Sequence, residues 1–150
     1  MKNIHKFQSL GAGLALALSL AAGAAPASEA ASAQDSAREK VIFQVSADDA
    51  KTWNLALNNA RNVQQDLGAK NVDVEIVAYG PGIGMLKFDS VVANRIDEAV
   101  GNGVKVVACE NTMKAQKLAK ADMLASTGYV PAGVVELMKR QREGYVYIRP

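Results

Sequence analysis

From residue 40 onward, short runs of apolar residues alternate with longer segments in which apolar positions recur every three or four residues. Runs of the first kind predict buried strands, and segments of the second kind predict amphipathic helices. The predicted strands span residues 41–45, 72–79, 105–108, 129–130 and 145–148. The first predicted helix follows a turn and cap at residues 46–49, with Asp48 and Asp49 as the capping residues, and ends at a glycine cap at Gly68. The others run from a cap at Asp89 or Ser90 to Gly101, and over residues 112–120 and 132–142.

This alternation determines the predicted fold class. Strand–helix–strand units connect parallel strands, so we expect an α/β fold with a mostly parallel sheet of about five strands, covered by helices on both faces. The carboxyl ends of parallel strands lie at one edge of the sheet, where ligands of such proteins bind. Loops 46–49, 79–89 and 109–112 are predicted to meet at that edge. The pattern leaves the order of the strands open.

The N-terminal segment has the layout of a secretory signal peptide. Lys2 and Lys6 precede an apolar stretch, residues 10–22, that holds no charge and is too short to span a membrane comfortably. Small residues follow, and we expect cleavage after Ala27, with Ala33 as the alternative. We therefore predict a signal peptide over 1–27, a flexible polar tether over 28–39, one folded domain over 40–150 and a periplasmic location. A retained N-terminal anchor is the alternative.

Removal of the leader changes the available chemistry. The chain has 17 basic and 15 acidic side chains, and two of the lysines and the only histidine, His5, belong to the leader. The mature domain is therefore formally neutral, which gives no electrostatic reason to expect binding to nucleic acid or to a membrane surface. The loss of histidine excludes serine–histidine and cysteine–histidine catalysis and histidine-ligated zinc in the mature domain. We expect no metal and no cofactor.

Cys109 is the only cysteine, and it lies where the third predicted strand ends and a helix begins. A thiol at this junction would lie beside free amides of the helix N-terminus, which favour the reactive thiolate. The amides near Asn111 and Thr112 would supply this stabilisation, whereas the neighbouring carboxylate of Glu110 would oppose it. The alternative is a structural role, because free cysteine is among the most frequently buried residues.

A glycine-rich loop follows the second predicted strand. Gly80, Gly82 and Gly84 do not meet the dinucleotide fingerprint, because Met85 follows them and because the loop is not the first of the sheet. Its backbone amides could contact an anion. The candidate substrate-binding residues are Tyr79, Gly80, Pro81 and Gly82 of this loop and, after the cysteine, Glu110, Asn111 and Thr112. The alternative is a flexible loop whose glycines allow positive φ.

Asparagines recur every four residues on the first predicted helix, at Asn54, Asn58 and Asn62. Asparagine is a poor residue for a helix interior. The stripe therefore predicts either hydrogen bonds to another element or subunit, or a solvated polar face.

Several of these segments resemble the DsrE/DsrF-like family. They are the residues around the cysteine (106–112), the C-terminal stretches 129–137 and 141–145, and the shorter motifs 57–62 and 79–82. The resemblance covers roughly residues 40–150 and implies a three-layer α/β/α domain that forms homo-oligomers, commonly trimers or hexamers. In relatives of the sulfur-relay branch, a cysteine after the third strand accepts and passes on a persulfide, and Cys109 is the matching position. Many relatives carry a histidine before Gly-Pro-Gly, where this chain has Tyr79.

The leading hypothesis is thus a periplasmic sulfur-handling protein. Cys109 would accept or carry sulfane sulfur as a persulfide, with a sulfur donor or acceptor protein as a possible partner, and the loop over residues 79–84 would cover it. The alternative is a non-catalytic module for small-ligand binding or homo-oligomeric assembly, in which Cys109 is buried and structural. A third hypothesis, an enzyme that uses carboxylates, requires two acids to meet in one pocket.

Overall fold

The predicted strands form one sheet in which all five strands run parallel. In the computed structural model, which describes residues 38–150, the strand order is β4-β3-β2-β1-β5. The strands are β1 (Glu39–Val45), β2 (Val72–Ala78), β3 (Lys105–Cys109), β4 (Gly128–Val130) and β5 (Val146–Ile148). The predicted α/β fold with a sheet of about five strands is confirmed.

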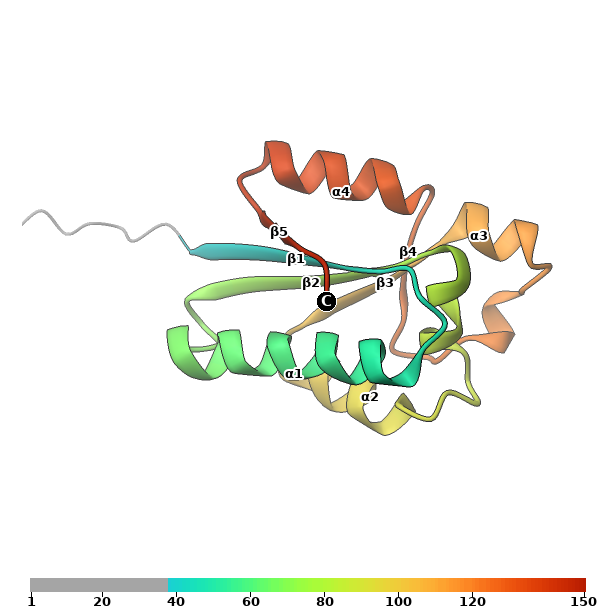
Figure 1. The fold of residues 1–150 in the computed structure, drawn as a ribbon, viewed down its shortest axis with the longest axis horizontal. Helices are drawn as coiled ribbons and strands as arrows, with labels where there is room; N and C mark the ends of the chain where they lie inside the picture. The colour runs from blue at the N-terminus through green and yellow to red at the C-terminus, as the bar shows by residue number, and fades with distance from the viewer. Residues whose placement is uncertain (1–37) are drawn as a thin grey trace, which may run out of the picture. The chain divides into compact units, whose positions relative to one another are not determined.

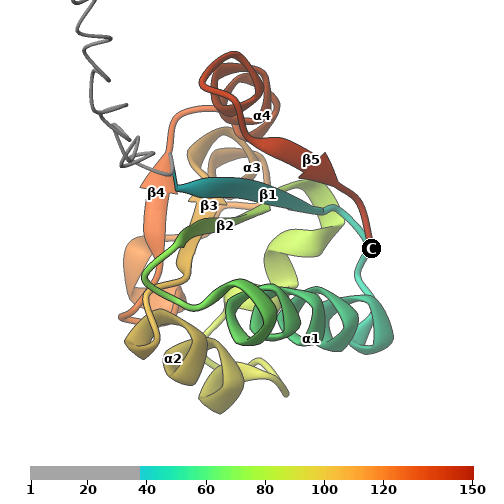
Figure 2. The same ribbon diagram turned by 90° about the vertical axis from the view of Figure 1, so that its left-hand side faces the viewer.

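Helices cover both faces of this sheet, which gives the three layers visible in Figures 1 and 2. Helices α1 (Ala50–Leu67) and α2 (Ala93–Gly101) lie together on one face, and α4 (Gly133–Arg142) lies on the other. The short helix α3 (Glu110–Ala115) directly follows β3. The segment after β4 crosses the sheet through α4 and returns as β5 beside β1.

The two faces of the sheet carry cores of different size. The face under α1 and α2 holds the larger core, which includes Phe43, Ile76 and Met85. The face under α4 holds only a small apolar cluster, made of Ile42, Val77, Val107, Val130 and Leu137. Apolar packing therefore holds α4 on the sheet much less firmly than it holds α1.

The caps predicted for α1 are confirmed, and α2 ends at Gly101 as predicted, but the predicted N-terminal cap of α2 at Asp89 or Ser90 is wrong. The Asp49 carboxylate accepts hydrogen bonds from the amides of Lys51 and Thr52, and Gly68 ends α1 with a φ of 85°. Helix α2 begins only at Ala93, after Val92. Asp89 pairs with Lys87 at 3.5 Å instead of capping the helix.

Two further segments differ from the sequence-based expectation. Helix α3 begins at Glu110 and ends at Ala115, because Lys117 adopts a left-handed backbone with a φ of 57°. The glycine-rich loop forms a 3₁₀ helix, η1 (Gly80–Leu86), and is not an open loop. Burial of Ile83, Met85 and Leu86 in the larger core explains its order.

The structured domain begins slightly earlier than predicted. Strand β1 includes Glu39, which pairs with Val72, and Arg38 forms an ion pair with Asp73 at 2.9 Å. These two residues were predicted to belong to the tether. The predicted signal peptide, both cleavage positions and the rest of the tether lie outside the described residues. Within residues 38–150, no helix has the length and apolar character needed to cross a membrane.

The asparagine stripe of α1 is used to join two helices. Arg95 of α2 donates hydrogen bonds to the side-chain oxygens of Asn54 and Asn58, the second at 2.7 Å. The predicted hydrogen bonds to another element are therefore confirmed for these two asparagines. The bonds fix α2 against α1 on the outer surface of that layer.

Candidate functional site

Cys109 lies at the carboxyl edge of the sheet, on the face covered by α4. It is the last residue of β3 and pairs with Val130 of β4. On the other side, Ala108 pairs with Ala78, so the next residue, Tyr79, lies beside Cys109. The cysteine is 5% exposed. The thiol is thus nearly enclosed, with the first turns of α3 and α4 next to it.

Polar groups, not aliphatic side chains alone, surround the sulfur. Burial raises the pKa of the Cys109 thiol, but hydrogen bonds from the Thr112 hydroxyl and from the backbone amides of Gly133, Thr112 and Asn111 lower it. The net result is a pKa below the ordinary thiol value. Amide and hydroxyl donors stabilise the thiolate, which is the nucleophilic form of cysteine. Thr112 and Gly133 thus place donors beside the sulfur, whereas the backbone amide of Asn111 also donates to the Pro131 carbonyl at 3.1 Å.

Thr112 connects the thiol to η1. The Gly80 amide donates a hydrogen bond to Thr112 Oγ1 at 2.9 Å, which leaves the hydroxyl proton available for the sulfur. The Gln116 side-chain amide also donates to the Gly80 carbonyl at 3.2 Å. Gly80 has a φ of 54°, a conformation that suits glycine. The position of η1 and the charge state of Cys109 are therefore linked through one hydroxyl group.

Replacement of Thr112 by valine should raise the pKa of Cys109 and leave the Gly80 amide without its partner. We expect slower alkylation of the thiol at pH 7 and a loss of stability of about 1–2 kcal/mol, the cost of an unmet buried hydrogen bond. Thiol alkylation against pH and urea unfolding measure the two effects. Thr127→Val is the matched control, because the Thr127 hydroxyl is buried without a hydrogen-bond partner. Equal thiol pKa values in both variants would contradict the role of Thr112.

Tyr79 packs directly under the start of α4. A Cβ atom at Gly133 would lie 3.0 Å from Tyr79 Cβ and 3.2 Å from its ring, so a larger residue would require Tyr79 to shift by a few tenths of an ångström. Burial raises the pKa of the Tyr79 phenol, and the nearby Tyr147 adds to this effect, against a smaller opposing effect of Arg149. Tyr79 is therefore a neutral hydrogen-bonding group at physiological pH and not a general base.

A row of polar side chains continues from Tyr79 towards β5. A hydrogen bond from Ser46 partly offsets the rise in the pKa of Tyr79. The Gln44 amide donates to Ser46 Oγ at 3.1 Å, and the Tyr147 hydroxyl donates to Gln44 Oε1. This row lies between the carboxyl ends of β1 and β5, where the chain changes direction across the sheet. Sequence reasoning missed these residues, although Gln44 is a polar residue within an apolar strand.

The backbone amides of the glycine segment are engaged within the protein. Gly82 donates to the carbonyls of Ser46 and Tyr79 at 3.2 and 3.1 Å, and Gly80 donates to Thr112. Gly82 is buried against the end of β1. Pro81 is exposed and lines a separate cleft. Of the four candidate residues in this segment, Tyr79 and Gly80 therefore lie close to the thiol group, whereas Pro81 and Gly82 serve other contacts.

Glu110 and Asn111 follow the thiol but point to different partners. The Glu110 carboxylate is 4.0 Å from Lys120 Nζ and is partly exposed. The Asn111 amide donates to the Pro131 carbonyl at 3.1 Å, which ties α3 to the segment between β4 and α4. This bond helps to hold the beginning of α4 beside the cysteine.

A cleft of about 500 Å³ opens beside η1, and Cys109 is not among its lining residues. Its lining residues come from the loop before α1, from α1, η1, the loop before α2 and the end of α3: Asp48, Trp53, Pro81, Gly84, Lys87, Asp89, Ser90, Val91 and Gln116. Asp48 and Asp89 thus share one cleft, as an enzyme that uses carboxylates would require. Asp89 is paired with Lys87, however, and among residues 38–150 no cation forms an ion pair with Asp48.

These features define a class: a three-layer α/β/α protein with a hydrogen-bonded cysteine at the carboxyl edge of a parallel sheet. The model of the DsrE/DsrF-like family matches residues 39–150. The chain belongs to this family, which is generally linked to sulfur relay. No curated protein matches the chain.

Solved structures agree with this assignment. The chain is similar to MTH1491 from Methanobacterium thermoautotrophicum, a protein of unknown function, with 37% identity and a TM-score of 0.71. The match covers 75% of this chain and 99% of MTH1491. BT1422 from Bacteroides thetaiotaomicron, a conserved protein of unknown function, matches with 16% identity and a TM-score of 0.54, over 75% of this chain and 95% of BT1422. This second likeness supports the fold alone.

Proposed function

We propose that the protein handles sulfane sulfur and that Cys109 carries it as a persulfide. The observation that supports this most directly is the set of hydroxyl and amide donors around the sulfur, which lowers its pKa despite burial. A purely structural cysteine in an apolar core would have a raised pKa. Membership of a family linked to sulfur relay points to the same chemistry.

The proposed step is a simple displacement. The Cys109 thiolate attacks the outer sulfur of a donor such as thiosulfate or a polysulfide. A new S–S bond forms to Cys109, the S–S bond of the donor breaks, and the donor leaves with the electron pair as sulfite or a shorter polysulfide. Because Cys109 is 5% exposed, the groups that enclose it must shift to admit the donor. The amides of Gly133 and Thr112 then stabilise the persulfide anion as they stabilise the thiolate.

Intact-protein mass spectrometry tests this proposal. After exposure to thiosulfate or polysulfide, the wild-type protein should gain about 32 Da, the mass of one added sulfur, and dithiothreitol should remove it. Cys109→Ser should gain nothing. No adduct on the wild type, or an equal adduct on Cys109→Ser, would exclude the proposed chemistry. Thiol alkylation that proceeds only at the rate of global unfolding would instead favour a structural cysteine.

A second candidate function, small-ligand binding, is favoured by the cleft beside η1. Its volume of about 500 Å³ suits a small molecule. Asp48 is the charged lining group without an ion-pair partner among the described residues, so we expect a ligand that carries a positive charge.

Trp53 makes this second function measurable, because it lines the cleft and is the only tryptophan of the chain. Free arginine should change the tryptophan fluorescence in a saturable manner, whereas free glutamate should not. Asp48→Asn should abolish the change, and prior alkylation of Cys109 should leave it intact. Equal responses to both amino acids would contradict a charge-selective site.

We also propose that the protein self-associates and that it acts after export. The resemblance to oligomeric relatives and the exposed apolar residues Val134, Val135 and Met138 on α4 support self-association. Sedimentation should show a trimer or hexamer for the wild type and a larger share of monomer for Val135→Glu.

The proposed export is tested by cell fractionation and by the mass of the mature chain. The protein should be found in the periplasm with a new N-terminus after Ala27 or Ala33.

A further inference from the structure

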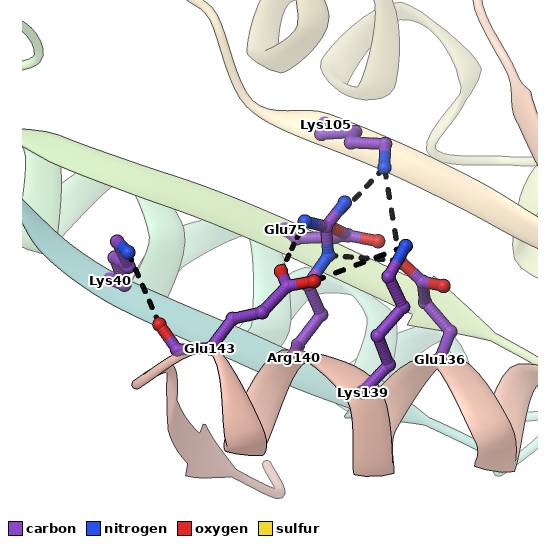
Figure 3. A network of polar contacts seen from close by, with 7 residues as sticks. All are labelled: Lys40, Glu75, Lys105, Glu136, Lys139, Arg140 and Glu143. Atoms are coloured by element: carbon purple, nitrogen blue, oxygen red, sulfur yellow. Dashed lines mark hydrogen bonds and ion pairs between the residues drawn. The ribbon is translucent and has the colours of Figure 1, made fainter.

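A cluster of charged side chains lies between the sheet and α4 (Figure 3). Glu75 projects from the middle of β2 and is 1% exposed. Arg140 Nε of α4 lies 2.8 Å from Glu75 Oε2 and 2.9 Å from Glu136 Oε1. Lys105 Nζ of β3 lies 3.4 Å from Glu75, and Glu143 accepts a hydrogen bond from Arg140 at 2.9 Å. We call Glu75, Glu136 and Arg140 the buried ion cluster.

Apolar packing alone does not determine how α4 is rotated on the sheet. Its buried residues are Gly133, Glu136 and Leu137, so one apolar side chain is buried. Val134, Val135 and Met138 are each more than half exposed, although they are apolar. A helix rotated about its axis could therefore bury other apolar side chains at little cost. Some other interaction must select the observed rotation.

The buried ion cluster can make this selection. Gly133, Glu136 and Arg140 are separated by three and four residues, so they share one face of the helix. Rotation of α4 would move Arg140 away from Glu75 and leave a buried carboxylate with Lys105 as its remaining nearby cation. An uncompensated buried charge is strongly unfavourable, and in some proteins buried polar groups select one arrangement among alternatives. The same rotation would move Gly133 away from Tyr79.

We propose that Arg140, through its ion pairs with Glu75 and Glu136, is a positioning residue for Cys109: it sets the rotation of α4 and so holds the Gly133 amide at the sulfur. The inference deepens the proposed function, on which its biological meaning depends. Gly133 lies two helical turns before Arg140 and touches Tyr79, the neighbour of Cys109 in the sheet. The cluster thus acts on the thiol without contact to it.

A folded variant without the ion pair provides the test. Glu75→Leu/Arg140→Met replaces the pair by apolar side chains of similar size, a change that buried ion pairs often tolerate without loss of stability. The pKa of Cys109 is measured from the rate of iodoacetamide alkylation against pH, with circular dichroism as the check of folding. We expect alkylation at pH 7 to slow about threefold or more, since each pKa unit changes the thiolate fraction about tenfold.

Lys139→Met is the matched control, because Lys139 is an exposed cation next to Arg140 in sequence, 4.0 Å from Glu143. It should leave the thiol pKa at the wild-type value. A folded double variant with an unchanged thiol pKa would overturn the proposal. If the double variant does not fold, the same measurement is made on Glu75→Gln. We expect the pKa of Cys109 to rise in this variant as well, and an unchanged pKa would overturn the proposal. Failure of the wild type to gain sulfur would refute the persulfide function but not this comparison of pKa values.

Discussion

Replacement of Arg140 alone by methionine should destabilise the protein by about 3–5 kcal/mol, the usual cost of removing one partner of a buried ion pair. Without Arg140, Lys105 is the cation that still reaches Glu75 and Glu136. Glu75 is only 1% exposed, so water cannot take the place of the lost guanidinium. A domain of this size has a free energy of unfolding of about 5–15 kcal/mol. The variant should therefore fold at low temperature but unfold at a much lower urea concentration than the wild type. The double variant Glu75→Leu/Arg140→Met should regain the part of the lost stability that comes from Glu75, whereas Glu136 keeps only Lys105, at 4.0 Å.

The effect of Arg140→Met should depend on pH in a defined direction. Burial raises the pKa of Glu75, while Lys105 and Arg140 lower it again. A carboxyl with a raised pKa in the folded state contributes stability below its ordinary pKa, and this contribution is lost as pH rises through the raised value. Loss of Arg140 raises the pKa of Glu75 further. The difference in free energy of unfolding between the wild type and Arg140→Met should therefore be smaller at pH 5 than at pH 8.

Urea unfolding of wild type, Arg140→Met and the exposed control Lys139→Met at these two pH values measures both effects. The control should stay within about 0.5 kcal/mol of the wild type, since its ion pair with Glu143 is exposed. If Arg140→Met lowers the free energy of unfolding by less than about 1 kcal/mol, or if the loss shrinks as pH rises, Glu75 is exposed to water and the prediction is wrong.

Substitution of Gly82 by alanine should be the second most damaging single change, with a loss of about 3 kcal/mol or more from overpacking. An added Cβ would lie 2.5 Å from the Val45 carbonyl oxygen and 2.8 Å from Ser46 Cα. These are backbone atoms of the interior strand β1 and the loop that follows it, so no side chain can move aside to relieve the clash. The segment η1 would shift and take with it the Gly80 amide that supports Thr112.

Gly101→Ala is the matched control for this prediction. Gly101 ends α2, and a Cβ atom there would meet no atom within 4 Å. Alanine is a better helix residue, so the control should be unchanged or more stable by up to about 1 kcal/mol. Thermal unfolding and the alkylation rate of Cys109 report the two consequences of Gly82→Ala. Wild-type stability in this variant would mean that η1 does not pack on β1 as described.

Local residue patterns predicted much of the fold. The β-branched runs located all five strands, and the Asp49 and Gly68 signals located the ends of α1, because these features act through neighbouring residues. Predictions failed where distant contacts decide the conformation. Ile83, Met85 and Leu86 turn a glycine-rich segment into a 3₁₀ helix because the core buries them. Lys117 ends α3 early through a left-handed backbone that its own sequence does not favour.

For the candidate site, the sequence by itself determined the position of Cys109 at the end of a strand and the presence of amides from the following helix. Only the tertiary structure decided that Tyr79 lies beside it, that Gly133 of α4 donates to it, and that Arg140 and Glu75 meet above the sheet. Gly133 and Arg140 lie 24 and 31 residues from Cys109 in the chain. Contacts over such separations depend on strand order and on the face that each crossover helix takes, and neither is encoded in a local pattern.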